Sequence, residues 1–319
     1  MGKTGVIIVN WNGGESILEC LRHLDLQKDV NPRILVVDNN STDESLVMIR
    51  ELYPDTEIIC NSNNPGFAVA CNQGVSHLHD CQWIALLNPD AFPEPDWLTT
   101  LVNIAKGSSE HHSFASLIVS HNDPTIIDSA GDAYLNDGRG VHRLHGQNIN
   151  KVNTFPIEVF AAAGAGALYR RESLIEVGGF DERFFCYYED IDLGFRLQLL
   201  GYKCLLVPAA RISHVGGGTT GGVNNDHSLF YCQRNFVWTF FKNMPALLLF
   251  LYLPKHILYL VGGLVRGYRL GKLRLMLRAT RDALKELPSV LMDRWRSQLE
   301  RRINIHTLRD ILGPGEGYE

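Results

Sequence analysis

The chain has 319 residues, of which 45% are hydrophobic and 20% are charged, and its net charge is −5. This is the composition of a globular protein, and the length suits one large domain or a domain with an extension. Seven scattered cysteines without a CxxC pair suggest neither a disulfide framework nor a zinc knuckle. We therefore expect reduced thiols, as in a cytosol, and we interpret the first residues as a strand rather than a signal peptide.

Short apolar runs and helix-like segments alternate through the first 120 residues. The apolar runs predict buried strands at 5–10, 34–38, 57–60 and 83–88. The segments between them predict helices near 15–27, 43–53, 67–79 and 95–106. This alternation predicts an α/β fold with a doubly wound, mostly parallel sheet. Because such sheets bind ligands at the carboxyl ends of their strands, the polar clusters that follow the four runs are candidate site residues.

The remaining chain divides at a change in composition. Short strand candidates occupy about 113–170, and a helix, a carboxylate-rich segment, a strand pair and a glycine-rich loop follow up to about 240. Beyond residue 244 the sequence becomes apolar and then basic, with a helical pattern. We predict two domains, 1–243 and 244–319.

Several single residues have both a functional and an ordinary interpretation. Asp38, at a strand end, could accept hydrogen bonds from a nucleobase or ribose, or could simply be a turn residue. Asp90 could hold Mg²⁺ if substrate phosphates supply further ligands. His214 could add a nitrogen ligand, which favours manganese over calcium, or could be structural. Arg234 could bind a phosphate or form a surface ion pair.

The segment "FFCYYEDIDLGFRLQLLGY" (184–202) joins aromatic residues to three carboxylates at the start of a predicted helix. Its buried stripe is expected at Ile191, Phe195 and Leu199. Asp192 and Arg196 are four residues apart and should pair on the helix surface. Glu189 and Asp190 could cap the helix or act in catalysis, and these residues alone do not choose between the two roles.

The sequence lacks a dinucleotide fingerprint after its first strand, and two other common nucleotide and hydrolase motifs do not occur. The first strand is not followed by G-x-G-x-x-G, and neither G-x-x-x-x-G-K-[ST] nor G-x-S-x-G occurs. A Rossmann dehydrogenase is therefore disfavoured.

Six segments in a fixed order carry a family resemblance: "VIIVNWNGGESILECLRHL", "ILVVDNNSTDES", "NNPGFAVACNQG", "LLNPDAFPEPDWL", "GALYRRESLIEVGGFDERFFCYYEDIDLGFRLQLLGY" and "ISHVGGGT". Together they span roughly residues 5–240. In this arrangement the chain resembles the family 2 glycosyltransferases of the GT-A fold, especially bacterial rhamnosyltransferase-like members.

The resemblance implies a role for each group of site residues. The substrate-binding set would be Val9, Asn10, Trp11, Asp38, Asn64, Gly66, Phe67, Asn72, Asn88, Glu189 and Arg234. A divalent cation, Mg²⁺ or Mn²⁺, would be held by Asp90 and His214. Asp190 would be the catalytic base. Asn88 stands where the family often has an aspartate, and it cannot add a negative charge.

These roles describe an inverting, metal-dependent glycosyltransferase. A cation would stabilise the leaving diphosphate, and one carboxylate would take the proton of the acceptor hydroxyl. The resemblance implies L-rhamnose transfer from dTDP-L-rhamnose to a lipid-linked or cell-surface glycan. The alternatives are a transferase that uses a UDP- or GDP-sugar and a catalytically silent subunit that binds a sugar nucleotide.

The C-terminal segment is expected to bind membranes peripherally. Residues 266–302 contain eleven Lys/Arg against four Asp/Glu. The preceding apolar runs, 246–253 and 257–265, are separated by Pro254-Lys255-His256, and each is shorter than the ~20 residues needed to span a bilayer. Downstream, basic residues (Arg274, Arg278, Arg281, Lys285) and leucines (Leu270, Leu273, Leu277, Leu284) share a helical pattern. This predicts binding to an anionic membrane at its cytoplasmic face, rather than to nucleic acid. A packed helical subdomain or a homo-oligomer contact is the alternative.

Overall fold

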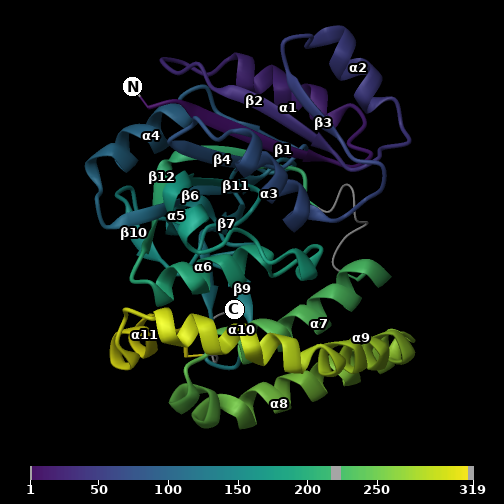
Figure 1. The fold of residues 1–319 in the computed structure, drawn as a ribbon. Helices are drawn as coiled ribbons and strands as arrows, with labels where there is room; N and C mark the ends of the chain where they lie inside the picture. The colour runs from purple at the N-terminus through teal and green to yellow at the C-terminus, as the bar shows by residue number, and fades with distance from the viewer. Residues whose placement is uncertain (1, 217–223, 315–319) are drawn as a thin grey trace.

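The computed structural model describes residues 2–216 and 224–314. Its central sheet has the strand order β10-β12-β6-β11-β4-β1-β2-β3, with β5 attached to β12 and β7 to β6 (Figure 1). The strands of this sheet are β1 (Thr4–Asn10), β2 (Arg33–Asp38), β3 (Glu57–Cys60), β4 (Trp83–Leu87), β5 (Ala91–Pro93), β6 (His111–Ser120), β7 (Ile127–Ala130), β10 (Ile157–Val159), β11 (Gly166–Arg170) and β12 (Lys203–His214). A separate hairpin is formed by β8 (Asp132–Tyr134) and β9 (Gly140–His142).

The N-terminal half of the sheet is parallel, as the sequence predicts. Strands β3, β2, β1 and β4 pair in parallel, and Asn10 lies opposite Asp38, which lies opposite Cys60. Helices connect these strands: α1 (Ser16–Asp25), α2 (Ser45–Leu52), α3 (Phe67–His77) and α4 (Trp97–Gly107). The polar clusters therefore do meet at one edge of the sheet.

The other half of the sheet is mixed. Strand β11 is antiparallel to both β4 and β6, while β12 runs parallel to β6 and antiparallel to β5 and β10. The doubly wound parallel part is thus confined to the first half of the chain, and β11 joins it to the second half. The α/β architecture and the C-terminal helices confirm the predicted fold class.

Helix α6 (Glu189–Leu199) buries its predicted stripe, and its polar face is buried as well. Arg196 Nε donates to Asp192 Oδ2 over 2.8 Å, so the predicted pair forms. The pair does not lie on the surface, however, because α7 (Asp226–Asn243) covers it. Lys242 Nζ and Asn243 Nδ2 of α7 lie 2.9 and 2.8 Å from the Asp192 carboxylate, whose side chain is 0% exposed. Asp192 is therefore part of a buried ionic network.

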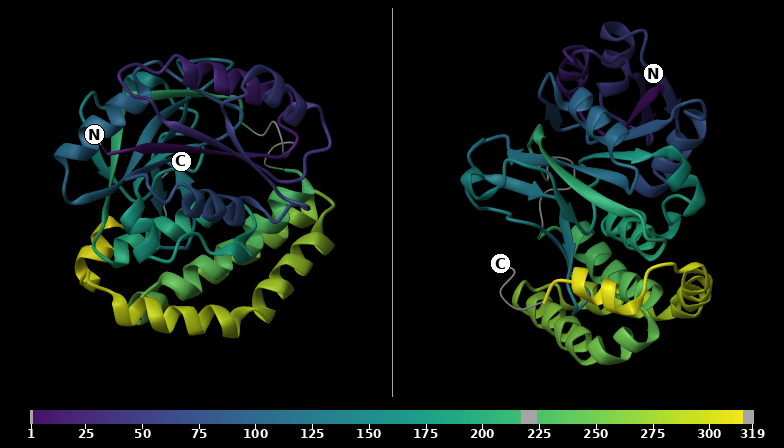
Figure 2. Two further views of the ribbon diagram at one scale, coloured as in Figure 1. Left: turned by 45° about the horizontal axis from the view of Figure 1, so that its top comes forward. Right: turned by 90° about the vertical axis from the view of Figure 1, so that its left-hand side faces the viewer.

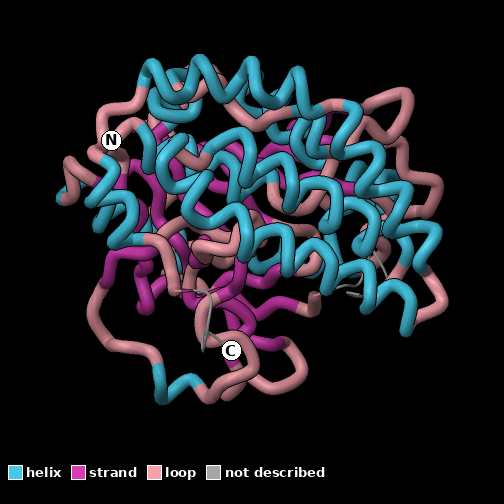
Figure 3. The backbone as a smooth tube through the Cα atoms, turned by 90° about the horizontal axis from the view of Figure 1, so that it is seen from below, coloured by secondary structure: helices cyan, strands magenta, loops and turns pink. Residues whose placement is uncertain are grey.

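The C-terminal helices form a layer beside the sheet domain (Figures 1 and 2). They are α8 (Ala246–Arg269), α9 (Leu273–Lys285), α10 (Leu287–Glu300) and α11 (Ile305–Ile311). Seen from below, α8, α9 and α10 lie along this face of the molecule (Figure 3). The expected boundary at residue 244 falls in the turn between α7 and α8.

Helix α8 corrects one expectation from the sequence. The two apolar runs form a single 24-residue helix that includes Pro254, and its length and composition would suffice to cross a membrane. The helix continues because Pro254 lies on its exposed side, while its other side packs on the protein. On the packed side, the His256 ring stacks on Phe236 and Phe240, with centroids 4.2 and 4.0 Å apart. The length of α8 therefore does not exclude a membrane span, whereas the sequence argument from two short apolar runs did exclude one.

Helix α9 buries mainly small side chains and leaves two leucines of the predicted interfacial pattern exposed. Its buried residues are Met276, Ala279 and Ala283, whereas Leu277 and Leu284 are 49% and 55% exposed. The small side chains allow close packing against the neighbouring helices, and the leucines are left at the surface.

Candidate active site

Asp90 and His214 are brought together by the pairing of β5 with β12, in which His214 lies opposite Ala91. The Nε2 atom of His214 is 3.2 Å from Asp90 Oδ1, and Asn88 Nδ2 lies 3.5 Å from the same nitrogen. The other ring nitrogen, Nδ1, is 2.7 Å from Asp128 Oδ2 on β7. Burial opposes protonation of His214, but its hydrogen bonds with Asp128 and Asp90 outweigh burial and raise its pKa to about 9.

This arrangement fits a divalent cation. A carboxylate oxygen and an imidazole nitrogen point at each other, and a second carboxylate orients the imidazole, as outer partners of metal-bound histidines do. No group of three or more His, Cys, Asp or Glu side chains gathers as a metal site in the described parts of the chain. The protein thus offers two ligands here, which suits an ion that also binds substrate phosphates. The glycine-rich stretch after Gly216 lies outside the described residues.

Asp190 lies at the first turn of α6, and its side chain is partly exposed. Its Oδ2 accepts a hydrogen bond from Gly164 N (3.0 Å), and its Oδ1 accepts one from Ile191 N (2.8 Å). Ala165, which follows Gly164 in the chain, accepts a hydrogen bond from Asn88 N through its carbonyl oxygen (3.2 Å). One short turn, 164–165, therefore touches both the Asp190 carboxylate and the strand end that carries Asp90.

The aromatic segment before α6 has a strained backbone. Phe185, Tyr187 and Tyr188 have φ values of 65°, 64° and 68°, which non-glycine residues rarely adopt. The Nδ2 atom of Asn235 on α7 donates to the carbonyl oxygens of Phe184, Cys186 and Tyr187 over 2.7–3.0 Å. Hydrogen bonds from α7 therefore stabilise the strained backbone conformation of this segment.

Arg234, like Asn235, holds the backbone of the segment before α6 by donating hydrogen bonds to its carbonyl oxygens. Its guanidinium donates to the carbonyl oxygens of Arg183 and Phe184, both at 2.9 Å, and lies 4.2 Å from the ring centroid of Trp238. Neither a phosphate contact nor a surface ion pair is supported by this geometry. Arg234 instead holds the segment that leads to Asp190.

Glu189 differs from its neighbour in burial. It is 7% exposed, and burial, followed by the negative charge of Asp190, raises its pKa well above the usual range. Burial thus favours the protonated form of Glu189. Little of Glu189 is exposed for the expected substrate contact.

At the carboxyl ends of β1 and β2, Asp38 connects the two segments that follow these strands. It is 2% exposed and accepts hydrogen bonds from Asn10 Nδ2 (2.8 Å) and Ser41 Oγ (2.6 Å). Asn10 is fully buried, and Val9 is 8% exposed. Direct contact of these side chains with a base is not supported by their burial. Among the expected residues of this strand end, Trp11 is the more exposed one.

The segment 64–72 packs against the region before α6. Gly66 has a φ of 97°, and a Cβ there would come within 2.6 Å of the Phe185 carbonyl oxygen, so a glycine is required. Phe67 N donates to that same oxygen, and Asn64 Oδ1 accepts from Gly66 N. Asn72 has a structural role: its Nδ2 donates to the Phe180 carbonyl oxygen, and its Oδ1 accepts from Phe180 N.

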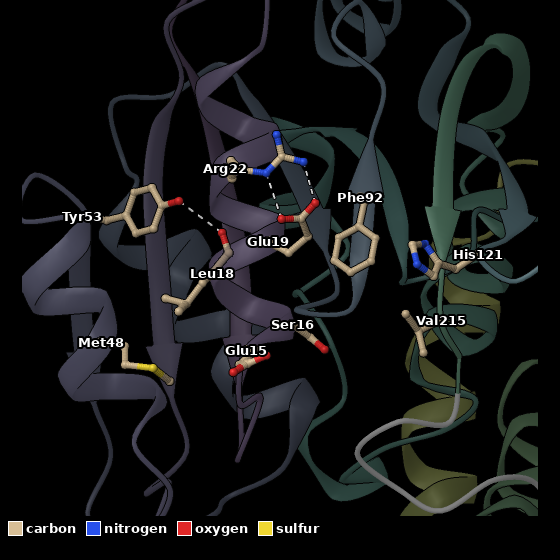
Figure 4. A pocket seen from close by; sticks show the side chains of 10 residues that line it. All are labelled: Glu15, Ser16, Leu18, Glu19, Arg22, Met48, Tyr53, Phe92, His121 and Val215. Carbon is tan, nitrogen blue, oxygen red and sulfur yellow. Dashed lines mark hydrogen bonds and ion pairs between the residues drawn. The ribbon is translucent and has the colours of Figure 1, made fainter.

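Two hollows lie near this region. The larger, ≈ 610 Å³, lies between α1, α2 and β5, and its walls include Glu19, Arg22, Tyr53 and Val215 but none of Asp38, Asp90 or Asp190 (Figure 4). The smaller, ≈ 180 Å³, is lined in part by Asp128, His145 and His214. We place the candidate site at the Asp90–His214 pair, whose histidine lines the smaller hollow, and at Asp190, which the 164–165 turn connects to the Asp90 strand end.

Comparison with known proteins agrees with this geometry. Residues 5–178 match the model of "Glycosyl transferase family 2". The chain belongs to this family. It is a glycosyltransferase of the GT-A fold, and it is similar to rhamnosyltransferase members of family 2.

Two relatives illustrate that similarity. N-acetylglucosaminyl-diphospho-decaprenol L-rhamnosyltransferase of Mycobacterium tuberculosis (strain H37Rv) is 26% identical over 254 residues, which cover 73% of this chain and 82% of the relative. Rhamnosyltransferase WbbL of Escherichia coli (strain K12) is 27% identical over 225 residues, which cover 66% of this chain and 82% of the relative.

Two solved structures share the fold of this family 2 member. GalNAc-T7 with UDP, GalNAc and Mn²⁺ aligns with a TM-score of 0.58 at 19% identity, covering 75% of this chain but only 47% of the GalNAc-T7 chain. The mannosyltransferase PcManGT from Pyrobaculum calidifontis, in complex with GDP-Man and Mn²⁺, aligns with a TM-score of 0.53 at 18% identity. That alignment covers 94% of this chain and 85% of PcManGT.

Proposed function

We propose that this enzyme transfers L-rhamnose from dTDP-L-rhamnose to a hydroxyl of a lipid-linked glycan, with inversion at the anomeric carbon. The observation that carries the proposal is the Asp190 carboxylate, which accepts hydrogen bonds from Ile191 N on α6 and from Gly164 N on the turn that also contacts the Asp90 strand end. The named activities of two relatives support rhamnose as the sugar. The name of the mycobacterial relative supports a diphospholipid-linked acceptor.

In this proposal Asp190 is the general base. It takes the acceptor proton as the acceptor oxygen forms a bond to the anomeric carbon and the bond from that carbon to the diphosphate oxygen breaks. Burial raises the pKa of Glu189 and favours its protonated form, and Asp192 lies in a buried ionic network, so neither is as suited to this role. One base and no protein acid distinguish this reaction from glycoside hydrolysis, which uses two carboxyl groups.

Asp90 and His214 would hold Mg²⁺ or Mn²⁺ together with the donor diphosphate. When bound, the cation would neutralise the charge that develops on the leaving group. Asp128 keeps the His214 ring oriented toward Asp90. The solved structures that share the fold contain Mn²⁺, which supports a divalent cation.

We also propose that the enzyme works at the cytoplasmic face of the membrane, where a lipid-linked acceptor would be found. The outward side of α8 is apolar along much of its length, with Leu247, Phe250 and Leu258 64–74% exposed. Exposed apolar residues occur on α10 as well, where Met292 and Trp295 are 75% and 72% exposed. Exposed basic side chains on α9, such as Arg278 (67%) and Arg281 (64%), would favour anionic lipid.

We interpret α8 as lying in the membrane interface. Its inward side packs on the protein, with His256 stacked between two phenylalanines, and a Cβ at Gly267 would clash with Met276. A membrane span would have to give up these contacts.

A donor panel tests the proposed function. Purified protein with Mn²⁺ and a diphospholipid-linked N-acetylglucosamine should consume dTDP-L-rhamnose and yield the rhamnosylated lipid by mass spectrometry. Turnover of a UDP- or GDP-sugar in its place would support the alternative transferase. Donor binding without consumption would support the silent subunit.

A further inference from the structure

Helix α10 has its polar and apolar sides reversed relative to an ordinary surface helix, which buries its apolar stripe. Within this helix, all of which the structure describes, only Val290 is buried. Four large apolar side chains are instead 42–75% exposed: Leu291, Met292, Trp295 and Leu299. On the inner side, Arg294 and Gln298 donate hydrogen bonds to backbone carbonyl oxygens in 241–244, at the end of α7. The position of α10 is therefore fixed largely by directional polar contacts.

Two of these polar contacts are made to Arg183, which precedes the strained segment before α6. Arg183 lies in a short 3-10 helix, η2 (Glu182–Phe184). Its guanidinium donates to Ser289 Oγ over 2.8 Å and to Asp293 Oδ2, both on α10. The same guanidinium donates to both carboxylate oxygens of Asp181, over 2.9 and 2.5 Å. Because the planar guanidinium presents its donors in a rigid fork, these contacts fix its orientation as well as its place.

Two routes lead from Arg183 to Asp190. The first is the chain itself, because the carbonyl of Arg183 is held by α7 and the strained segment follows directly, ending at α6. The second runs through side chains. Asp181 accepts a hydrogen bond from Lys242 Nζ over 2.7 Å, and the same Nζ donates to Asp192 over 2.9 Å. This second route reaches α6 two residues after Asp190, so α10 is connected to the start of α6 by both routes.

We propose that Arg183 and Asp293 are positioning residues for the transfer reaction: through this pair, α10 fixes the start of α6 so that the Asp190 carboxylate meets the acceptor hydroxyl. This inference rests on the proposed role of Asp190 as the base. Neither Arg183 nor Asp293 contacts the reacting atoms in this scheme. The C-terminal helices thereby act in the transfer step as well as at the membrane.

The exposure of the pair allows positioning to be separated from support of the fold. The side chains of Arg183 and Asp293 are 30% and 41% exposed. Ion pairs that solvent reaches contribute little to folding stability, and Arg183 keeps Asp181 as a partner when Asp293 is lost. Loss of the Asp293 carboxylate should therefore leave the fold intact and release one side of the guanidinium. A displacement of about 1 Å at the reacting groups can lower a rate by roughly 10²-fold.

The test is a series of substitutions at Asp293, measured as kcat with Mn²⁺, dTDP-L-rhamnose and a lipid-linked acceptor in detergent, so that liposome affinity does not enter the rate. Asp293→Lys places a like charge beside Arg183 and should lower kcat on the order of 10²-fold, and Asp293→Ala should lower it about tenfold. Asp293→Glu retains the carboxylate and should restore a rate close to that of the unmodified enzyme. Donor Kd and the midpoint of urea unfolding should stay unchanged throughout the series.

The matched control is the same series at Asp80. Its side chain is 32% exposed and pairs with Lys3 and Arg33 where β1 and β2 begin, at the edge of the sheet opposite to Asp38. Asp80→Ala and Asp80→Lys therefore remove a comparable ion pair at a distance from the candidate site. Their kcat should equal that of the unmodified enzyme.

Three results would overturn the proposal: a near-normal kcat for Asp293→Lys, a loss that Asp293→Glu does not restore, or a loss that merely follows a fall in the unfolding midpoint. Asp190→Asn, measured in parallel, separates this inference from the proposed function. An active Asp190→Asn would show that the role of the base has failed. An inactive Asp190→Asn together with a normal Asp293 series would refute the positioning pair alone.

Discussion

Serine substitution of three exposed residues on α8 should release the enzyme from anionic membranes without unfolding it. Leu247, Phe250 and Leu258 are 64%, 73% and 74% exposed. Full burial of such a side chain contributes about 1.5–3 kcal/mol, so burial of the exposed part contributes about 1–2 kcal/mol each. The triple variant should therefore lose about 3–6 kcal/mol, or on the order of 10²–10⁴-fold in membrane affinity. Folding stability should change little, because these side chains are already largely in water.

Flotation with liposomes that contain phosphatidylglycerol, at low and high salt, measures this affinity. A matched control replaces Val47, Leu52 and Phe155 with serine, since they are 56–63% exposed but lie on the sheet domain. The control should float like the unmodified protein. Equal flotation of the α8 variant would refute the reasoning. Unmodified protein that resists high salt and alkaline carbonate would show that α8 spans the bilayer.

Three further predictions concern single carboxylates. Asp90→Ala should weaken Mn²⁺ binding in the presence of dTDP by at least the ~10–100-fold typical of losing an outer partner of a metal ligand, and unchanged titration curves would contradict the metal assignment. Asp192→Asn should cost about 3–5 kcal/mol in urea unfolding, because Arg196 would remain buried without its counter-charge and Lys242 would keep only Asp181; a shift below about 1 kcal/mol would show that the network is not stabilising. Burial raises the pKa of Glu189 above its ordinary 4.5, so the folded state retains a proton that the unfolded state releases, and stability falls as pH rises above that value. Glu189→Gln should therefore gain stability relative to the unmodified protein as pH rises above 4.5, and a difference that does not change with pH would contradict the raised pKa of Glu189.

The sequence predicts the elements that local patterns define. The apolar runs of β1, β2, β3 and β4 are bounded by polar turns, so their positions and their common edge can be recognised without a structure. The helical spacing of Ile191, Phe195 and Leu199 likewise identifies the buried stripe of α6. Family resemblance, rather than spacing, is what distinguishes Asp190 from its neighbours.

The partners of the candidate site could not be predicted, because they are set by pairing between distant segments. Asp128 reaches His214 across 86 residues through the strands on either side of β6, and Gly164 reaches Asp190 across 26. The spacing of Asp192 and Arg196 suggests a pair on the helix surface. The pair is buried because α7 packs over it, and its contact residue Lys242 is 50 residues away from Asp192 in the sequence. Pro254 appears to break a helix, yet α8 continues because packing on α7 and α9 stabilises it.

The role of Asp190 is tested most directly by the single-turnover transfer rates of Asp190→Asn and Glu189→Gln, with donor Kd measured for each. Asp190→Asn preserves size but cannot accept the hydroxyl proton, so its rate should fall ~10²–10⁴-fold while donor affinity is retained. Glu189→Gln replaces a buried acid, whose raised pKa favours the protonated form, with an amide of similar size and should keep a rate close to that of the unmodified enzyme. A near-normal rate for Asp190→Asn, or a large loss confined to Glu189→Gln, would contradict the assignment of Asp190 as the base.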